Sequence, residues 1–238
     1  MTFGRSMLPT PMLLSIETTE KFGSVALLDG GRLLRELRLP TSDRSAKTLA
    51  PALDCLLRGE HCLPADIMAV AVVVGPGSFT GLRVGVATAK AFAYAIGAKV
   101  VAVDTMRTVA AGVPFRDGFL SVGVDAQRGD VVAQTFELSP EGPQPVSERR
   151  LIAVADWWNE KERYPQIVFT GPALDRFRTK VSEGAILADE SLWTPKASVA
   201  GRLAAMRLAT GESDDLQSLV PIYSRLSAAE ERRLPAIS

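Results

Sequence analysis

Histidine and cysteine are scarce in this chain. Its 238 residues include one histidine, His61, and two cysteines, Cys55 and Cys62. A single histidine cannot form the His-x-x-x-His pair of many metal-dependent hydrolases, and two cysteines cannot build a disulfide framework. The three residues supply at most three zinc ligands, with no matching second pair. We therefore interpret this segment as a helix end without a metal, with reduced thiols as in cytoplasmic proteins.

An excess of charge and long apolar runs are also missing. Lysine plus arginine and aspartate plus glutamate both total 27, so the formal net charge is +0. That balance gives the isolated chain little electrostatic attraction to nucleic acid. No uninterrupted apolar run approaches the ~20 residues of a membrane span, and the apolar stretch 12–16 is shorter than the ~7–15 residues of an export signal. A cytoplasmic globular protein fits these absences.

The order of the expected elements is repeated once along the chain. In the first half, the pattern predicts strands at 12–17, 24–29, 32–39, 69–74 and 99–103, and helices at 46–57, 79–96 and 105–111. In the second half, it predicts strands at 119–125, 130–138, 149–154, 166–170 and 185–188, and helices at 155–162, 172–181 and 198–209. Pro51 disfavours helical geometry at the preceding residue, so we expect a bend or a late start in the first helix.

This repeated order predicts the fold class. Each half reads βββαβαβα, which indicates a duplicated α/β lobe with a mixed sheet covered by helices. Two such lobes facing each other across a cleft make the two-lobed actin/Hsp70-like (ASKHA) fold. We expect residues 12–110 to form the N-terminal lobe and 111–211 the C-terminal lobe. The tail 212–238 is expected to pack back on the first lobe, and 1–11 to form a disordered leader.

A glycine-rich string, G-P-G-S-F-T-G-L-R-V-G at 75–85, joins a buried strand to a helix. Such a junction can bind phosphate through backbone N–H groups and the helix dipole. It is not a Walker A loop, because no Gly-Lys-Ser/Thr follows, and it is not a nucleophile elbow, because Ser78 lacks flanking glycines. Ser78 is better explained as the helix N-cap.

Small residues recur every four positions along this helix: Gly77, Gly81, Gly85, Ala89, Ala93 and Gly97. On a helix these positions form one ridge, whose side chains are no larger than a methyl group. Interior glycines cost up to ~1 kcal/mol each against alanine, so a close contact must compensate. That contact can come from this chain or from a second chain, and the pattern leaves both open.

Two turns are candidates for phosphate contact in an actin-like fold. The first is Glu17-Thr18-Thr19, with a carboxylate and small residues. The second begins at Asp125 and continues Ala-Gln-Arg-Gly, which places bulky side chains where glycines are wanted. We interpret both as weakened nucleotide sites, because a lone turn carboxylate is at least as often structural.

Several motifs together resemble the bacterial TsaB (YeaZ) family. They are I-E-T-T (16–19), V-G-P-G-S-F-T-G-L-R-V-G (74–85), V-D-T-M (103–106), V-D-A-Q-R-G-D-V (124–131) and P-I-Y-S-R (221–225). The resemblance implies a non-catalytic dimerisation subunit of the machinery that places threonylcarbamoyl on the tRNA adenosine next to the anticodon. It implies a TsaD-like catalytic paralogue and a TsaE-like ATPase as partners, a homodimer when alone, and tRNA contact only through the complex.

The resemblance also implies where partners bind. It carries a helical interface onto Phe79, Gly81, Leu82, Gly85, Val86, Ala89, Lys90, Leu49 and Leu53. It implies no catalytic residue, metal or cofactor in this chain, and it leaves the role of Arg83 open.

Two other functions remain as alternatives. An independent nucleotide-dependent enzyme, a small-molecule kinase or ATPase, would place Glu17 and Asp125 facing each other across the cleft. A metallopeptidase is disfavoured by the single histidine.

Overall fold

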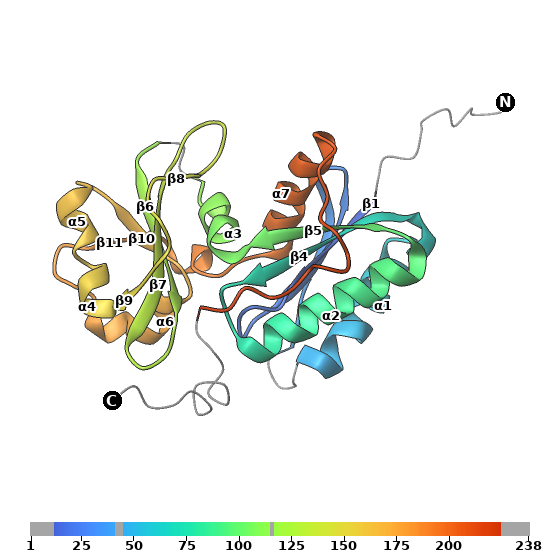
Figure 1. Ribbon diagram of the computed structural model, residues 1–238, viewed down its shortest axis with the longest axis horizontal. Coiled ribbons are helices and arrows are strands. Elements are labelled where there is room, and N and C mark those ends of the chain that lie inside the picture. Colours follow the sequence, from blue (N-terminus) through green and yellow to red (C-terminus); the bar gives the residue numbers. More distant parts are fainter. Residues whose placement is uncertain (1–11, 41–44, 115–116, 225–238) are drawn as a thin grey trace.

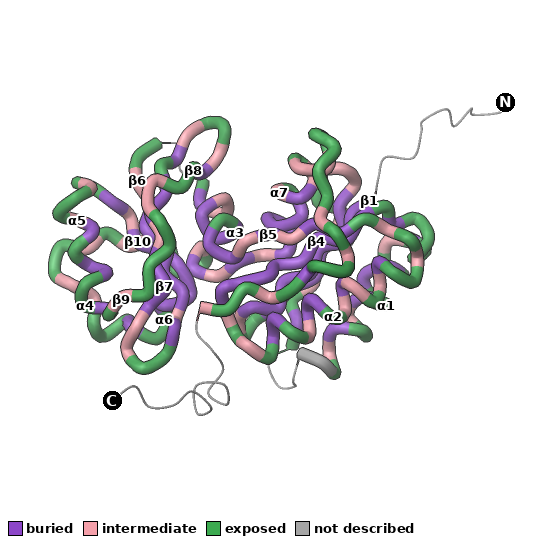
Figure 2. Tube along the Cα trace, viewed as in Figure 1, coloured by how far each residue is buried: buried purple, intermediate pink, exposed green. Residues whose placement is uncertain are grey.

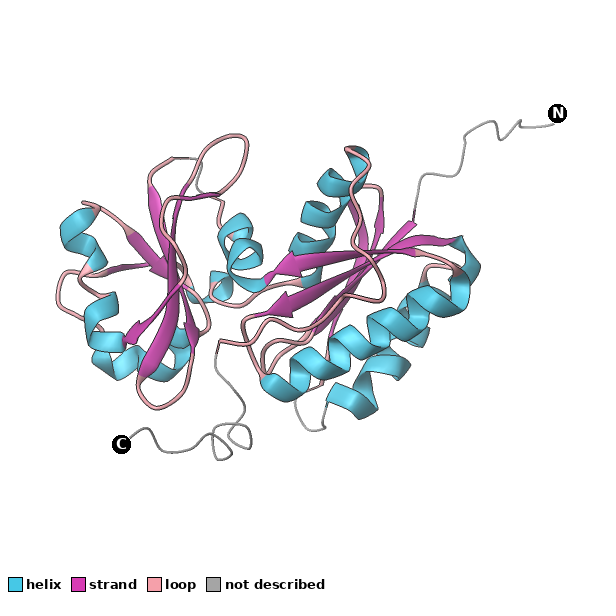
Figure 3. Ribbon diagram, viewed as in Figure 1, coloured by secondary structure: helices cyan, strands magenta, loops and turns pink. Residues whose placement is uncertain are grey.

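The computed structural model describes residues 12–40, 45–114 and 117–224. It contains two mixed sheets with helices packed on them (Figures 1 and 3), so the predicted α/β fold class with two mixed sheets is confirmed. The expected leader, 1–11, and the tail beyond residue 224 lie outside the described residues. No helix within the described ranges combines the length and apolarity that crossing a membrane requires.

The first sheet has the strand order β3-β2-β1-β4-β5. Its strands are β1 (Met12–Glu17), β2 (Ser24–Asp29), β3 (Arg32–Arg38), β4 (Ile67–Gly75) and β5 (Lys99–Asp104). The first three pair as antiparallel neighbours, and β4 joins β1 and β5 in parallel. A parallel strand in the middle of a sheet is covered on both faces, which explains the β-branched run in β4.

The second sheet has the order β11-β10-β6-β7-β8, with β9 also paired to β7. Its strands are β6 (Phe119–Asp125), β7 (Asp130–Glu137), β8 (Gln144–Pro145), β9 (Arg150–Ala153), β10 (Val168–Thr170) and β11 (Ile186–Leu187). The helices expected at 155–162 and 172–181 are shorter here. They are α4 (Val154–Trp157), α5 (Glu160–Arg163) and α6 (Ala173–Phe177).

Helices cover both faces of the first sheet. Helices α1 (Ser45–Gly59) and α2 (Phe79–Ile96) lie on one face, and α7 (Ala197–Ala209) lies on the other (Figure 1). Helix α3 (Thr105–Gly112) contacts both β4 and β6, so it packs between the two sheets. Figure 2 shows buried residues along the strands and the inner faces of these helices.

Helix α7 follows the second sheet in the chain but packs on the first. The order of elements predicts that 198–209 belongs to the C-terminal lobe, whereas α7 contacts β1, β2, β4 and β5. Its Ala197, Ala200 and Ala204 are buried against that sheet, and a Cβ on Gly201 would overlap a Leu28 methyl group. The small side chains allow this close approach; the lobe limits near 110 and 211 stay predictions.

Helix α1 runs continuously through Pro51, contrary to the expected bend or late start. Pro51 is exposed, while Leu49, Leu53 and Leu56 on the opposite side are buried. Burial of three leucines outweighs the one backbone hydrogen bond that proline removes.

The segment after α7 returns along the first sheet (Figure 1). The Asp214 N–H donates to the Val100 carbonyl at 2.9 Å, and the Ile222 N–H donates to the Val74 carbonyl at 2.7 Å. The described tail therefore covers parts of β4, β5 and α2.

Candidate functional site

The glycine-rich segment forms the junction between β4 and α2. Gly75 has a φ of 124°, and a Cβ there would overlap the Ile222 carbonyl oxygen. Only glycine fits both conditions. Ser78 Oγ accepts a hydrogen bond from the Gly81 N–H at 3.3 Å, so the predicted N-cap is confirmed.

The glycine ridge packs against the β1–β2 turn of the same chain. A Cβ on Gly81 would overlap the Thr18 carbonyl oxygen, and one on Gly85 would overlap Thr18 Oγ1. A Cβ on Gly77 would lie 2.7 Å from the Thr19 carbonyl oxygen. Of the two origins that the sequence left open, contact within the chain accounts for these glycines.

Several donors of this turn and of the α2 N-terminus bind within the chain. The Ser78 N–H donates to the Thr19 carbonyl at 2.7 Å, and Thr18 Oγ1 donates to the Gly81 carbonyl at 2.8 Å. The Thr19 N–H and hydroxyl both donate to Glu17 Oε1, at 2.5 and 2.7 Å. Phosphate recognition needs free backbone and hydroxyl donors, and the chain itself takes these four.

The Glu17 carboxyl is fully buried. Its Oε2 atom has no hydrogen-bond partner among the described residues. Burial raises the pKa of Glu17 to about 7, although the two bonds from Thr19 lower it. A buried carboxyl with one unpartnered oxygen favours its neutral form.

A second carboxylate, which the sequence reading missed, lies close by. Desolvation is the main cause that raises the pKa of Glu20 to about 8, and the charges of Glu17, Asp125 and Asp175 add to it. The turns of the two sheets therefore bring carboxylates together. In the sequence, Glu20 is distinguished only by its place three residues after Glu17, because two of its partners, Asp125 and Asp175, come from the other half of the chain.

The Asp125 turn is also closed on itself. Asp125 Oδ1 accepts from the Gln127 N–H at 2.8 Å, and Oδ2 pairs with Arg176 Nη1 at 2.7 Å. Gln127 and Arg128 occupy left-handed backbone, with φ of 63° and 56°. Asp125 is thus an ion-paired turn residue.

Acidic side chains of both turns lie close enough to interact, because the charges of Glu17, Asp125 and Asp175 act on Glu20. These negative charges disfavour a phosphate that carries no metal ion. Across the described ranges, no three His, Cys, Asp or Glu side chains are placed to share a metal ion.

The residues assigned to a partner interface are largely covered by their own chain. Those buried within it are Gly81, Leu82, Gly85, Val86, Ala89, Leu49 and Leu53. Phe79 and Lys90 are half-buried. In this chain the sheet and the β1–β2 turn cover that side of α2, and the assignment of these residues to a partner interface stays a prediction.

Arg83 and Lys90 hold the C-terminal tail. The Arg83 guanidinium lies 3.8 Å from the Phe79 ring centroid, and Nε donates to the Tyr223 hydroxyl at 3.0 Å. Lys90 Nζ donates to the carbonyls of Gln217 and Leu219, at 3.0 and 3.1 Å. This gives Arg83 a structural role that the motif alone did not reveal.

The outer side of α2 is exposed and weakly polar. Its exposed residues are Thr80, Arg83, Ala87, Ala91, Tyr94 and Ala95. Tyr94 exposes 76% of its surface. These positions recur at helical spacing, so they form one stripe along α2, which we call the outer face.

Comparisons with known proteins agree with the motifs. A family profile described as TsaD, tRNA N6-adenosine threonylcarbamoyltransferase, matches residues 40–231. The chain is 27% identical over 225 residues to the tRNA threonylcarbamoyladenosine biosynthesis protein TsaB of Bacillus subtilis, covering 92% of this chain and 96% of that protein. The TsaB protein of Escherichia coli is 26% identical over 232 residues, covering 91% and 96%.

Solved structures show the same fold. YeaZ from Pseudomonas aeruginosa matches with a TM-score of 0.74 at 24% identity, covering 90% of this chain and 99% of that one. A Pseudomonas aeruginosa protein described as similar to peptidase YEAZ gives a TM-score of 0.76 at 23% identity, covering 90% and 100%. With the profile match over residues 40–231, the chain belongs to the TsaD-like family and, within it, to the TsaB (YeaZ) group.

Proposed function

We propose that this chain acts in tRNA threonylcarbamoyladenosine biosynthesis as a non-catalytic subunit that pairs with a TsaD-like catalytic paralogue. The observation that carries the proposal is the internal use of the glycine-rich junction. Its helix N-terminus and the threonine turn bind each other, which takes donors that a phosphate cradle would use.

The outer face of α2 is the surface that supports pairing. Ala87 and Ala91 are exposed and small, so another helix can approach the α2 backbone closely. Tyr94 adds an exposed aromatic ring at the same face, and aromatic residues are enriched in protein interfaces. This surface replaces the buried side of α2 in the interface proposal.

The chain also takes part in a larger assembly. The chain forms a homodimer when alone and exchanges it for the TsaD-like partner, a TsaE-like ATPase joins the pair, and tRNA is held through the complex. The balanced composition, with 27 basic and 27 acidic residues, supports indirect tRNA contact, because counterion release by the chain alone is small.

Reconstitution tests the function. The TsaD-like and TsaE-like proteins of the same organism are assayed for tRNA threonylcarbamoylation with and without this chain. Omission should lower the rate at least ~10-fold, a loss of about 1.4 kcal/mol in transition-state stabilisation. An unchanged rate without this chain would sink the proposal.

A surface variant with a matched control distinguishes loss of partner binding from loss of folding. Ala91→Arg adds bulk and charge to the outer face, with little change in helix propensity. Ala155→Arg, on an exposed alanine of α4, is the matched control. We expect the first variant to lose stimulation and the second to keep it, with equal melting temperatures.

A further inference from the structure

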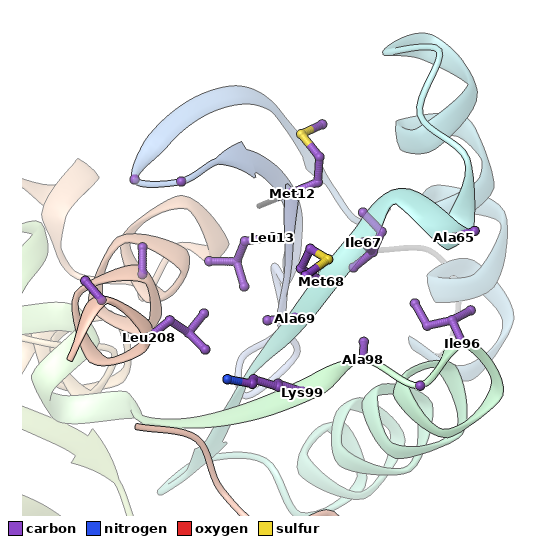
Figure 4. Close-up of a pocket in the computed structure, with 15 residues that line it drawn as sticks. Met12, Leu13, Ala65, Ile67, Met68, Ala69, Ile96, Ala98, Lys99 and Leu208 are labelled. Atoms are coloured by element: carbon purple, nitrogen blue, oxygen red, sulfur yellow. The ribbon is translucent and has the colours of Figure 1, made fainter. Parts of the chain in front are cut away.

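A pocket of about 600 Å³ opens at the far end of the first sheet (Figure 4). It lies at the start of β1, β4 and β5, beside the C-terminal half of α7. Glu17 and Gly75 end their strands at the opposite edge. Six residues of β1 span about 20 Å, so this pocket is separate from the glycine-rich junction.

Apolar side chains form the body of the pocket. Leu13 of β1, Met68 of β4 and Leu208 of α7 converge on it (Figure 4). The pairing of β1 with β4 shifts register between Met12 and Leu13, which leaves Met68 as an extra residue. This bulge leaves 60% of the Met68 surface exposed. Flexible methionine adapts to varied apolar partners.

Lys99 is the one charged residue that lines the pocket. Its ammonium group makes no hydrogen bond or ion pair to any residue that the structure describes. In the view of Figure 4 its ammonium group points toward Leu208. Two carboxylates that neighbour lining residues in the sequence have partners of their own: Asp29 pairs with Arg32 at 3.3 Å, and Asp66 accepts the Leu63 N–H at 2.7 Å.

We propose that this pocket binds an amphiphilic monoanion, an unbranched aliphatic carboxylate, with its carboxylate on Lys99 and its chain against Leu13, Met68 and Leu208. The volume of about 600 Å³ is within the ~300–1,000 Å³ of small-molecule sites. An apolar lining penalises a fully polar ligand, and an unpaired ammonium at the rim favours an anionic head group. Decanoate is a representative probe of this ligand class.

Calorimetric titration of the full chain tests this site with two probes, decanoate and the neutral decanamide. The wild type should bind decanoate saturably and about 10-fold more tightly than decanamide. Lys99→Gln should remove that preference, with decanamide affinity unchanged within about twofold. A wild type that binds neither probe saturably would overturn the proposal, and so would a decanoate preference that survives in Lys99→Gln.

Filling the pocket locates the binding. Ala205→Trp places an indole inside it, and Met206→Trp on the exposed side of α7 is the matched control. Decanoate binding should be lost in the first variant and retained in the second. Ala209→Trp at the exposed rim gives the same test if the Ala205 variant does not fold. Binding that persists in the filled variants lies elsewhere and contradicts the assignment.

One further arm tests a competing occupant. A chain that lacks residues 1–11 is titrated beside the full chain. Equal decanoate affinity supports the proposal. Binding only after this truncation would show that the N-terminal segment fills the pocket, and would overturn the assignment to a free ligand.

Discussion

At the scale of single residues, the buried Glu17 carboxyl of the β1–β2 turn makes the free energy of unfolding depend on pH. The ordinary pKa of this group is 4.5, and burial raises it to about 7 in the folded protein. Between these values the folded state keeps a proton that the unfolded state has lost. The free energy of unfolding therefore falls as pH rises through this window.

Urea unfolding measures this linkage. From about pH 5 to about pH 8, the wild type should lose on the order of 2–3 kcal/mol through Glu17. Glu17→Gln keeps an acceptor for Thr19 and cannot ionise, so the share of the pH dependence that Glu17 carries should disappear. Glu20, whose pKa is raised to about 8, should keep the rest. Glu183→Gln, at an exposed glutamate, should retain the wild-type dependence. A Glu17→Gln variant with the full wild-type slope would contradict the burial argument.

The sequence marked Glu17, Thr18 and Thr19 as one turn, and the structure places them together. It could not show that their donors are consumed internally, because the acceptor of Thr18 Oγ1 lies 63 residues away at Gly81. Polarity and spacing identify groups able to bind phosphate, whereas burial and partners decide whether they are free.

At the scale of elements, helix α2 begins at the glycine-rich junction and also contacts the C-terminal tail. Its four-residue glycine spacing correctly predicts a close backbone contact, now found at Thr18 and Thr19. Spacing alone could not name the covering element, since a helix row looks the same against a turn or another helix. The residues of the exposed outer face lie one or two positions in sequence from the small residues of the ridge.

Gly81→Ala tests the tight contact. A Cβ would overlap the Thr18 carbonyl oxygen, so the free energy of unfolding should drop by at least ~2 kcal/mol. Gly112→Ala in α3 is the helical control, because its nearest neighbour is a Val199 methyl at 3.7 Å. That control should change stability by no more than ~1 kcal/mol. Equal effects from the two substitutions would refute tight packing.

The tail contact gives a separate prediction at this scale. Arg83→Gln removes the stacking on Phe79 and the charge beside Tyr223. Amide exchange at Ile222, whose N–H bonds Val74, should then accelerate about fivefold, which corresponds to roughly 1 kcal/mol. Arg202→Gln, at an exposed arginine of α7, should leave that rate unchanged. No acceleration in the Arg83 variant means that the tail is held by other contacts.

At the scale of the whole molecule, the repeated strand and helix order predicts two mixed sheets, and the structure confirms them. The packing of α7 could not be predicted from local order. It depends on Ala197 and Ser198, whose N–H groups donate to Ser24 and Glu36 of the first sheet at 2.9 and 3.0 Å. Such contacts, more than 160 residues apart, leave no local signal in the chain.

The solution mass of this chain, alone and mixed with the TsaD-like protein of the same organism, tests the central claim of partner pairing most directly. We predict a homodimer that gives way to a heterodimer. Both species should be lost with Ala91→Arg on the outer face and kept with Ala155→Arg on α4. A chain that stays monomeric and unchanged by its partner would contradict the pairing function.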